Sequence, residues 1–313
     1  MAEDTEIRRT LAEGAARQLA NATKTRAYWG GITPRWLVPL LQWTPVEAGI
    51  FRLNRVKDDH EDGPTADVQC SPPKDRDPDL PETFVDYDDR PREYFLNAVT
   101  TVLDVQTRVS DLYSRPFDQI QEQLRLLIEK VKERQEGELI NNPEYGLLAN
   151  VAPGQRITTR KGRPTPDDLD DLLAKVWKEP SFFLAHPRAI AAFGRECTRR
   201  GVPPPTVTLF GTPFITWRGV PLIPSDKVAI DEATGTSKIL LIRTGEKKQG
   251  VVGLFQPGVP GEVAPSLSVR FMGINRKAIA SYLISLYCSL AVLTEDALAV
   301  LDHVEVDQYY DYA

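Results

Sequence analysis

Residues 117–148 read FDQIQEQLRLLIEKVKERQEGELINNPEYGLL and organise the rest of the chain. Ser114 and Pro116 suit the start of a helix, and Asn141-Asn142-Pro143 suits its end. The pattern predicts a helix over residues 117–140, about 35 Å long, with charged residues on the face opposite its apolar stripe. Apolar side chains recur at spacings of three and four and predict its buried face: Phe117, Ile120, Leu124, Leu127, Ile128 and Val131.

The segment before this helix has the two-residue period of a strand. It runs from Tyr94 to Asp111, and about 16 extended residues would cover about 50 Å, more than an ordinary strand. We expect it to pair with a strand at Gly49–Lys57, and the bare edges and apolar face of that long hairpin call for a neighbouring subunit. The apolar face contains Val99, Leu103, Val105 and Val109.

The N-terminal residues are rich in Trp and Leu but too few to make a core. Ile32–Trp43 must therefore dock on a larger surface, and both its own body and a neighbouring subunit remain open as partners. Asp58–Pro91 contains twelve acidic residues, three basic residues and six prolines. That composition is typical of an extended or mobile loop.

Downstream of the long helix, the pattern mixes helices and strands. Thr165-Pro166-Asp167-Asp168 supplies a cap, a proline and acids, and predicts a helix that turns Trp177 inward together with its leucines. Pro187–Arg199 predicts a second helix, which Gly201 ends before a stiff triple-proline loop. Strands are predicted at Ser181–Ala185, Thr206–Phe210, Phe214–Trp217, Lys238–Arg243 and Gly250–Phe255. Ala278–Leu293 favours a strand, but its serines also share a helical face, so a helix remains the alternative.

Composition argues against several classes of protein. The formal charge of -6 and the pI near 5.3 disfavour a nucleic-acid groove, which needs clustered Lys and Arg. Ala278–Leu293 is the most apolar segment and is too short to span a bilayer. The N-terminal sequence lacks the apolar core of a signal peptide. The odd number of widely spaced cysteines fits free thiols in a reducing cytosol: Cys70, Cys197 and Cys288.

No catalytic, cofactor-binding or metal-binding motif is found. His60, His186 and His303 lack metal-ligand spacing. Gly245–Gly250 resembles the start of a phosphate loop, but Val251-Val252 stands where Lys and Ser or Thr are needed, so a hairpin turn is the simpler interpretation. Nucleophile elbows and C-x-x-C pairs are missing as well.

Long stretches of this chain resemble encapsulin shell proteins, in particular the second encapsulin family and its cysteine-desulfurase-associated branch. The resemblance covers about Ala16 to Gln308 and implies the α+β fold of tailed-phage major capsid proteins. The stretches that resemble the family are PREYFLNAVTTVLDVQTRVSDLYS, EQLRLLIEKVKERQEGELINNPEYGLLAN, TPDDLDDLLAKVWKEPSFFLAHPRAIAAFGRE, GVPPPTVTLFGTPFITWRGVPLIPSDKV and QGVVGLFQPG through LSVRFMGIN.

The resemblance also implies a division of the chain. Arg200, Gly201, Val202 and Pro203 fall where encapsulins place the loop around the five-fold pore, although a plain structural loop remains the alternative. The implied parts are an N-terminal arm (1–44), an extended hairpin loop (45–112, with the acidic insertion 58–91), a peripheral domain (113–182 and 266–313, with the spine helix 117–140) and an axial domain (183–265).

The function that the resemblance implies is structural rather than enzymatic. About sixty copies would close into an icosahedral cytoplasmic nanocompartment around a cysteine desulfurase, with a role in sulfur storage. Any pyridoxal phosphate would belong to that cargo, and neither nucleic acid nor membrane would be a partner. The sister branch carries an inserted cyclic-nucleotide-binding-like domain, and nothing of that size interrupts residues 163–301, which favours the desulfurase-associated branch. The first alternative function is that of a viral major capsid protein. The second is that of an enzyme whose site is not recognised. The tyrosine-rich tail, 305–313, would pack on the surface or dock a partner.

Overall fold

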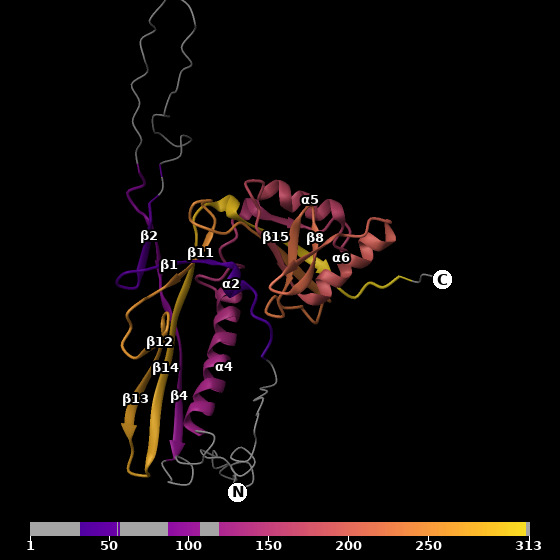
Figure 1. Ribbon diagram of the computed structural model, residues 1–313. Helices are drawn as coiled ribbons and strands as arrows, with labels where there is room; N and C mark the ends of the chain where they lie inside the picture. The colour runs from indigo at the N-terminus through magenta and orange to yellow at the C-terminus, as the bar shows by residue number, and fades with distance from the viewer. Residues whose placement is uncertain (1–31, 55, 57–86, 107–118, 311–313) are drawn as a thin grey trace, which may run out of the picture.

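The computed structural model describes residues 32–54, 56, 87–106 and 119–310, which form an elongated half and a compact half (Figure 1). Helix α4, Gln119–Asn141, runs down the elongated half and confirms the predicted helix over its described part. The Asn142 side chain accepts hydrogen bonds from the amides of Glu144 at 2.9 Å and Tyr145 at 3.3 Å, so the chain turns there. Residues 117–118 lie outside the described residues.

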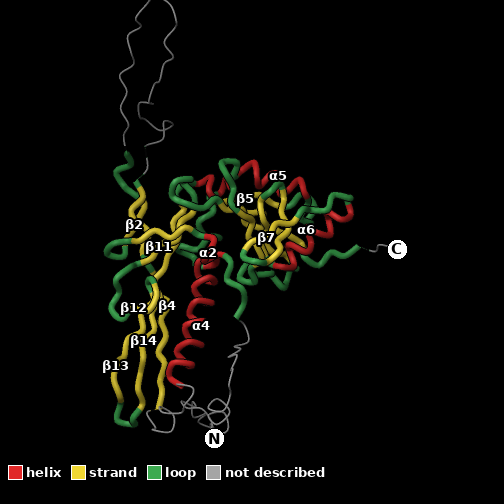
Figure 2. Tube along the Cα trace, in the orientation of Figure 1, coloured by secondary structure: helices red, strands yellow, loops and turns green. Residues whose placement is uncertain are grey.

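A six-stranded sheet lies along α4 (Figure 2). The long strand β14 confirms the strand predicted near residues 278–293, and it pairs in antiparallel fashion with β4, β11 and β13. At the far edge, β1 pairs with β11 in parallel fashion. The strands are β1 (Gln42–Pro45), β4 (Asn97–Gln106), β11 (Val251–Phe255), β12 (Glu262–Ala264), β13 (Leu267–Ile274) and β14 (Ile279–Val292).

The helix and this sheet bury each other's apolar faces. Alternate residues of the strands point at α4, so that the predicted stripe of the helix meets an apolar sheet face of the same chain. The fully or largely buried members are Val131, Leu267, Ile284 and Leu286, with Leu124, Leu127, Ile128, Val99 and Leu103 packed around them.

The prediction of one continuous strand from Tyr94 to Asp111 is wrong. The chain breaks at Leu96 into β3, Arg92–Phe95, and β4, and only β3 pairs with β2, Ile50–Leu53. β4 instead takes β14 as its neighbour through ten partners. One edge of β4 and the described part of its apolar face are thus covered by the same chain. The expectation that a neighbouring subunit must cover them is therefore wrong. Residues 107–111 lie outside the described residues.

The compact half contains a seven-stranded sheet with helices α5 and α6 beside it (Figures 1 and 2). The order of its strands is β5-β15-β10-β6-β9-β8-β7. The elements are β5 (Arg156–Thr158), α5 (Pro166–Lys175), β6 (Phe182–Ala185), α6 (Pro187–Arg199), β7 (Thr206–Leu209), β8 (Thr212–Trp217), β9 (Val220–Pro224), β10 (Thr236–Ile242) and β15 (Leu298–Glu305), with short 3-10 turns at Pro153–Gln155 and Glu295–Ala297.

The two sheets do not follow the expected division of the chain. Strand β15 comes after residue 265 but belongs to the compact half, whereas β11 and β12 come before it and belong to the elongated half. The turn Gly245–Gly250 is therefore not a hairpin, because it carries the chain from β10 in one sheet to β11 in the other. A side chain at Gly250 would place its Cβ 2.5 Å from the Arg243 carbonyl oxygen, so this tight crossing requires glycine.

Both helices of the compact half begin as predicted. Thr165 and Asp168 form a reciprocal capping box at α5, with the Thr165 amide 2.9 Å from Asp168 Oδ2. The predicted inward position of Trp177 is wrong, because α5 ends at Lys175 and Val176 leaves the helical backbone. Trp177 is 70% exposed as a result.

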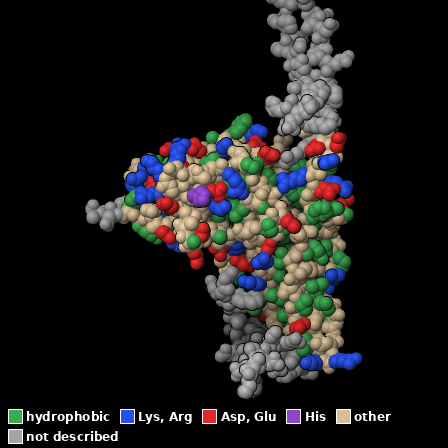
Figure 3. All heavy atoms as spheres, turned by 180° about the vertical axis from the view of Figure 1, so that it is seen from behind, with side chains coloured by type: hydrophobic (Ala, Val, Ile, Leu, Met, Phe, Trp, Pro, Cys, Tyr) green, Lys and Arg blue, Asp and Glu red, His purple; other side chains and the backbone are tan. Residues whose placement is uncertain are grey.

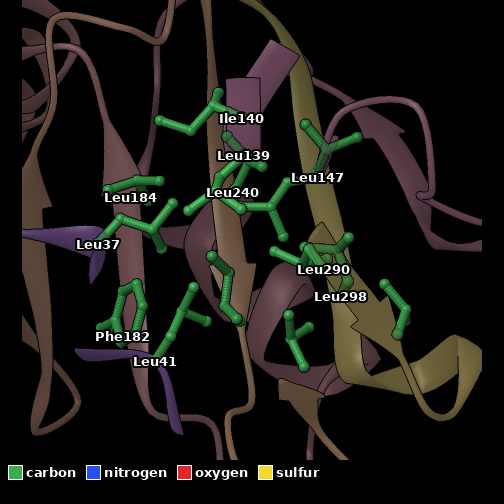
Figure 4. Packing of buried hydrophobic residues seen from close by; sticks show 14 of the residues in the cluster. Leu37, Leu41, Leu139, Ile140, Leu147, Phe182, Leu184, Leu240, Leu290 and Leu298 are labelled. Atoms are coloured by element: carbon green, nitrogen blue, oxygen red, sulfur yellow. The ribbon is translucent and has the colours of Figure 1, made fainter. Parts of the chain in front are cut away.

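The arm joins the two halves at a shared core (Figure 4). Leu37, the first residue of the single helical turn α2 (Leu37–Leu40), and Leu41, which caps its end, insert between the end of α4 and both sheets. The arm therefore docks on its own body from residue 32 onward, and residues 1–31 lie outside the described residues. The labelled core residues are Leu37, Leu41, Leu139, Ile140, Leu147, Phe182, Leu184, Leu240, Leu290 and Leu298.

Two leucines of β14 test the importance of the contact between helix and sheet. Leu286 is 5% exposed and faces α4, whereas Leu283 points to the other face. We expect Leu286→Ala to lower the free energy of unfolding by about 2–5 kcal/mol, because it leaves a cavity. Leu283→Ala is the matched control and should cost about 1 kcal/mol or less. Urea denaturation checks this, and equal losses for both variants would contradict the packing.

Candidate assembly surfaces and pore loop

Charged contacts fasten the described start of the arm to α4. The Thr33 hydroxyl lies 2.8 Å from Glu133 Oε1, and Arg35 Nη2 lies 2.5 Å from Glu129 Oε2. From the compact half, Lys227 reaches the same carboxylate, with its Nζ 2.6 Å from Glu133 Oε1. Lys227 and Glu133 are both nearly buried, so the ion pair is shielded from solvent and holds three segments together.

Glu136, one turn further along α4, is fully buried at the same junction. Ser225 donates a hydrogen bond to Oε1 at 3.3 Å, and Oε2 has no hydrogen-bond partner among the described residues. Burial raises the pKa of Glu136 to about 7, although Lys227 and Ser225 favour the charged form. Two of the charged residues opposite the apolar stripe, Glu133 and Glu136, are thus buried by the arm and the compact half.

The candidate pore loop follows the end of α6. Arg200 is the last capping residue, and its guanidinium pairs with the carboxylate of Glu196 one turn back. Gly201 has a φ of 68°, and the Val202 amide donates to the Cys197 carbonyl at 3.0 Å. Val202 is 48% exposed, and Pro203 is also exposed. The four predicted residues thus form one exposed, cap-stabilised turn.

Large apolar side chains are exposed on the subunit, and a view from behind shows hydrophobic atoms along the elongated half (Figure 3). Phe271, Met272 and Ile274 of β13 are each 57% to 61% exposed. Trp177 is 70% exposed on the compact half. Extended exposed apolar surface marks protein contact sites. Such a surface could not be predicted from the sequence, because its residues resemble core residues until the packing is known.

The described residues provide few groups that could bind a metal or act as a nucleophile. They contain no group of three or more His, Cys, Asp or Glu that could hold a metal, and no described helix is long and apolar enough to span a membrane. Burial raises the pKa of the Cys197 thiol to about 11 and that of the Cys288 thiol to about 12, so both stay protonated at neutral pH. Cys70 and His60 lie outside the described residues.

Two hollows are present on the described surface. A mainly apolar groove of about 630 Å³ lies where the arm meets α4 and the β13–β14 pair, lined by residues that include Trp43, Leu267 and Leu286. A more polar one of about 820 Å³ lies between β2 and the turn before β15, lined by residues that include Phe51 and Asp296. Neither contains an arrangement of nucleophile and base of the kind that enzymes use.

A helix-backed long sheet, joined to a compact mixed half and exposing apolar surface, is the architecture of capsid-forming shell proteins. Residues 53–308 match the family model of the SrpI-like type 2A encapsulin shell proteins. The type 2A encapsulin shell protein SrpI of Synechococcus elongatus is 70% identical over 303 residues, which cover 96% of each chain. This chain belongs to the type 2A encapsulin shell protein family.

Solved structures agree with this assignment. The cryo-EM structure of the holo-SrpI encapsulin complex from Synechococcus elongatus matches with a TM-score of 0.83 and 67% identity, over 97% of this chain and 99% of that one. The capsid of the native GTA particle matches with a TM-score of 0.59 at 16% identity, over 94% and 97%. The second likeness concerns the fold alone, and it confirms the predicted capsid fold. The chain is a structural shell protein of a multi-subunit capsid-like nanocompartment, not an enzyme.

The buried carboxylate of Glu136 makes stability depend on pH. Between the ordinary pKa of 4.5 and about 7, the unfolded chain releases this proton while the folded chain keeps it. Stability therefore falls as pH rises through this window. We expect Glu136→Gln to remove that loss. The free energy of unfolding of the variant, relative to that of the wild type, should then be higher at pH 8 than at pH 4 by on the order of 3 kcal/mol.

Glu129→Gln is the control with the opposite sign. Burial raises the pKa of Glu129, but Arg35 and Lys132 lower it further, so the net pKa lies below the ordinary value. The ionised Glu129 thus stabilises the folded chain above that range, and its removal should cost stability at pH 8. Thermal unfolding followed from pH 4 to pH 8 measures both effects. An unchanged pH slope in Glu136→Gln would show that this carboxylate is not the group responsible.

Proposed function

We propose that the nanocompartment built by this chain encloses a cysteine desulfurase in the cytoplasm and serves sulfur storage. The support is the close match to the SrpI shell protein, together with the resemblance to the desulfurase-associated branch. The desulfurase would bring its own pyridoxal phosphate. The shell's contribution is confinement, for which a closed surface of packed subunits suffices.

We further propose that about sixty copies close with icosahedral symmetry. The exposed apolar residues of β13 and Trp177 support this arrangement, since contacts between neighbouring copies would remove them from water. The surface charge fits a protein cargo better than a packaged genome. A net charge of -6 would repel a polyanion, whereas a viral capsid usually presents a basic lining.

The loop Arg200–Pro203 is proposed to surround the opening at each five-fold axis. What supports the assignment is its exposure at the end of α6 and its stiffness, since Pro203, Pro204 and Pro205 each fix a backbone angle. Five copies of Val202 would then line a narrow apolar opening. Solutes that enter the compartment would have to pass it.

Electron microscopy of the purified protein, with mass spectrometry of what co-purifies, tests the proposed function. We expect closed particles that contain a desulfurase from the source cells, because the cargo is enclosed rather than surface-bound. Nuclease-treated particles should release little nucleic acid on denaturation. Particles filled with nucleic acid would favour the viral alternative, and empty particles from source cells would contradict the cargo assignment.

Charge at Val202 tests the pore assignment. In assembled shells loaded with a fluorescent dye, we expect Val202→Glu to slow quenching by iodide severalfold, because a ring of carboxylates repels anions. Val202→Lys should not slow it. Val263→Glu is the matched control, since Val263 is 59% exposed but lies on β12 in the other sheet. Equal quenching rates in all four shells would place the solute path elsewhere.

A further inference from the structure

Arginines hold the described end of the chain against the compact half, beside α6 (Figure 1). Arg195 of α6 donates from Nε to the Gln308 carbonyl at 3.0 Å and from Nη2 to the Val306 carbonyl at 2.8 Å. Its guanidinium carbon also lies 4.5 Å from the centre of the Tyr309 ring. The tail up to Tyr310 therefore packs on its own subunit, which is one of the two alternatives expected for it, and residues 311–313 lie outside the described residues.

Tyr310 makes a different set of contacts from Tyr309. Arg163 donates from Nη1 to the Tyr310 hydroxyl at 2.7 Å, and its guanidinium carbon lies 4.9 Å from the ring centre. Arg199 of α6 lies over the same ring at 5.1 Å. Each guanidinium is attracted to the ring's electron-rich face, so the Tyr310 ring contacts both arginines.

The same two arginines face Glu196, which is only 2% exposed. Arg163 Nη1 lies 3.9 Å from Glu196 Oε1, and Arg199 Nη2 lies 3.4 Å from Oε2. Arg200 pairs with that second oxygen as well. A carboxylate buried to this extent needs its cations in place, since a displaced partner leaves charge without compensation. The position of Arg200 therefore depends on the ion pairs that Arg163 and Arg199 make with the same Glu196 carboxylate.

Arg200 is also the residue at which the candidate pore loop begins. The Gly201 amide donates to the Thr198 carbonyl and the Val202 amide to the Cys197 carbonyl, both at 3.0 Å. A continuous set of contacts thus runs from Tyr310 through Arg163 and Arg199 to Glu196 and Arg200. Tyr309 has no part in it, because Arg195 contacts backbone carbonyls and not Glu196.

We propose that Tyr310 is a positioning residue for the loop Arg200–Pro203, which it holds through the arginines around Glu196. The C-terminal tail then acts as a brace for the loop of its own subunit. The part of this inference that concerns passage of solutes rests on the proposed function of the loop as a pore. The part that concerns loop rigidity stands on the contacts alone.

Hydrogen exchange on assembled shells tests the brace. We expect Tyr310→Ala to speed exchange of the Gly201 and Val202 amides about fivefold or more, because the arginines lose the ring that positions them. Tyr310→Phe keeps the ring and should restore most of the protection. Tyr309→Ala is the matched control and should leave both amides unchanged. Equal exchange in wild type and Tyr310→Ala overturns the inference, as does an equal effect of Tyr309→Ala.

Iodide quenching of dye-loaded shells then separates the brace from the pore. Faster exchange together with an altered quenching rate in Tyr310→Ala supports both the brace and the proposed pore. Faster exchange with an unaltered quenching rate supports the brace and contradicts the pore assignment. Tyr310 is partly exposed at the end of the chain, so its replacement leaves the core of the subunit intact.

Discussion

Burial of the apolar stripe of α4 against the sheet of β4, β13 and β14 is the contact on which the subunit depends. This contact stiffens the elongated half, because a sheet open to water on both faces would lack such support. The far end of the same helix enters the core shared with the compact half, through Leu139 and Ile140. One helix therefore fixes the angle between the two halves, and a shell with defined curvature needs that angle to be the same in every copy.

Around this contact, polar groups decide how the remaining segments attach. Glu133 and Glu136 hold the arm and the loop at Lys227 to α4, while Glu196 gathers arginines at the end of α6. Each carboxylate is buried, so a mispositioned partner would be costly. The apolar contacts supply stability, and these buried polar junctions select one arrangement of arm, helix and loop.

The parts of the fold that were predictable are those with local signals. The bounds of α6 follow from Pro187 and Gly201, and the alternation along β14 favours a strand. The break at Leu96 was missed although Leu96 is out of phase with the face formed by Val99 and Leu103, because the change of strand partners involves residues distant in sequence. Strands β13 and β15 were missed for the same reason, since their pairing depends on residues distant in sequence.

The functional surface was predictable only where a motif marks it. The resemblance pointed to the loop at Arg200, whose role stays a prediction, whereas burial of Glu136 and exposure of Trp177 depend on tertiary packing. Strand β1 adds a consequence for synthesis. Its hydrogen-bond partner β11 lies near the opposite end of the polypeptide. Because β1 precedes β11 and β14 in the chain, it can pair only after those strands have left the ribosome. A chain that ends before β11 therefore lacks the strand with which β1 pairs.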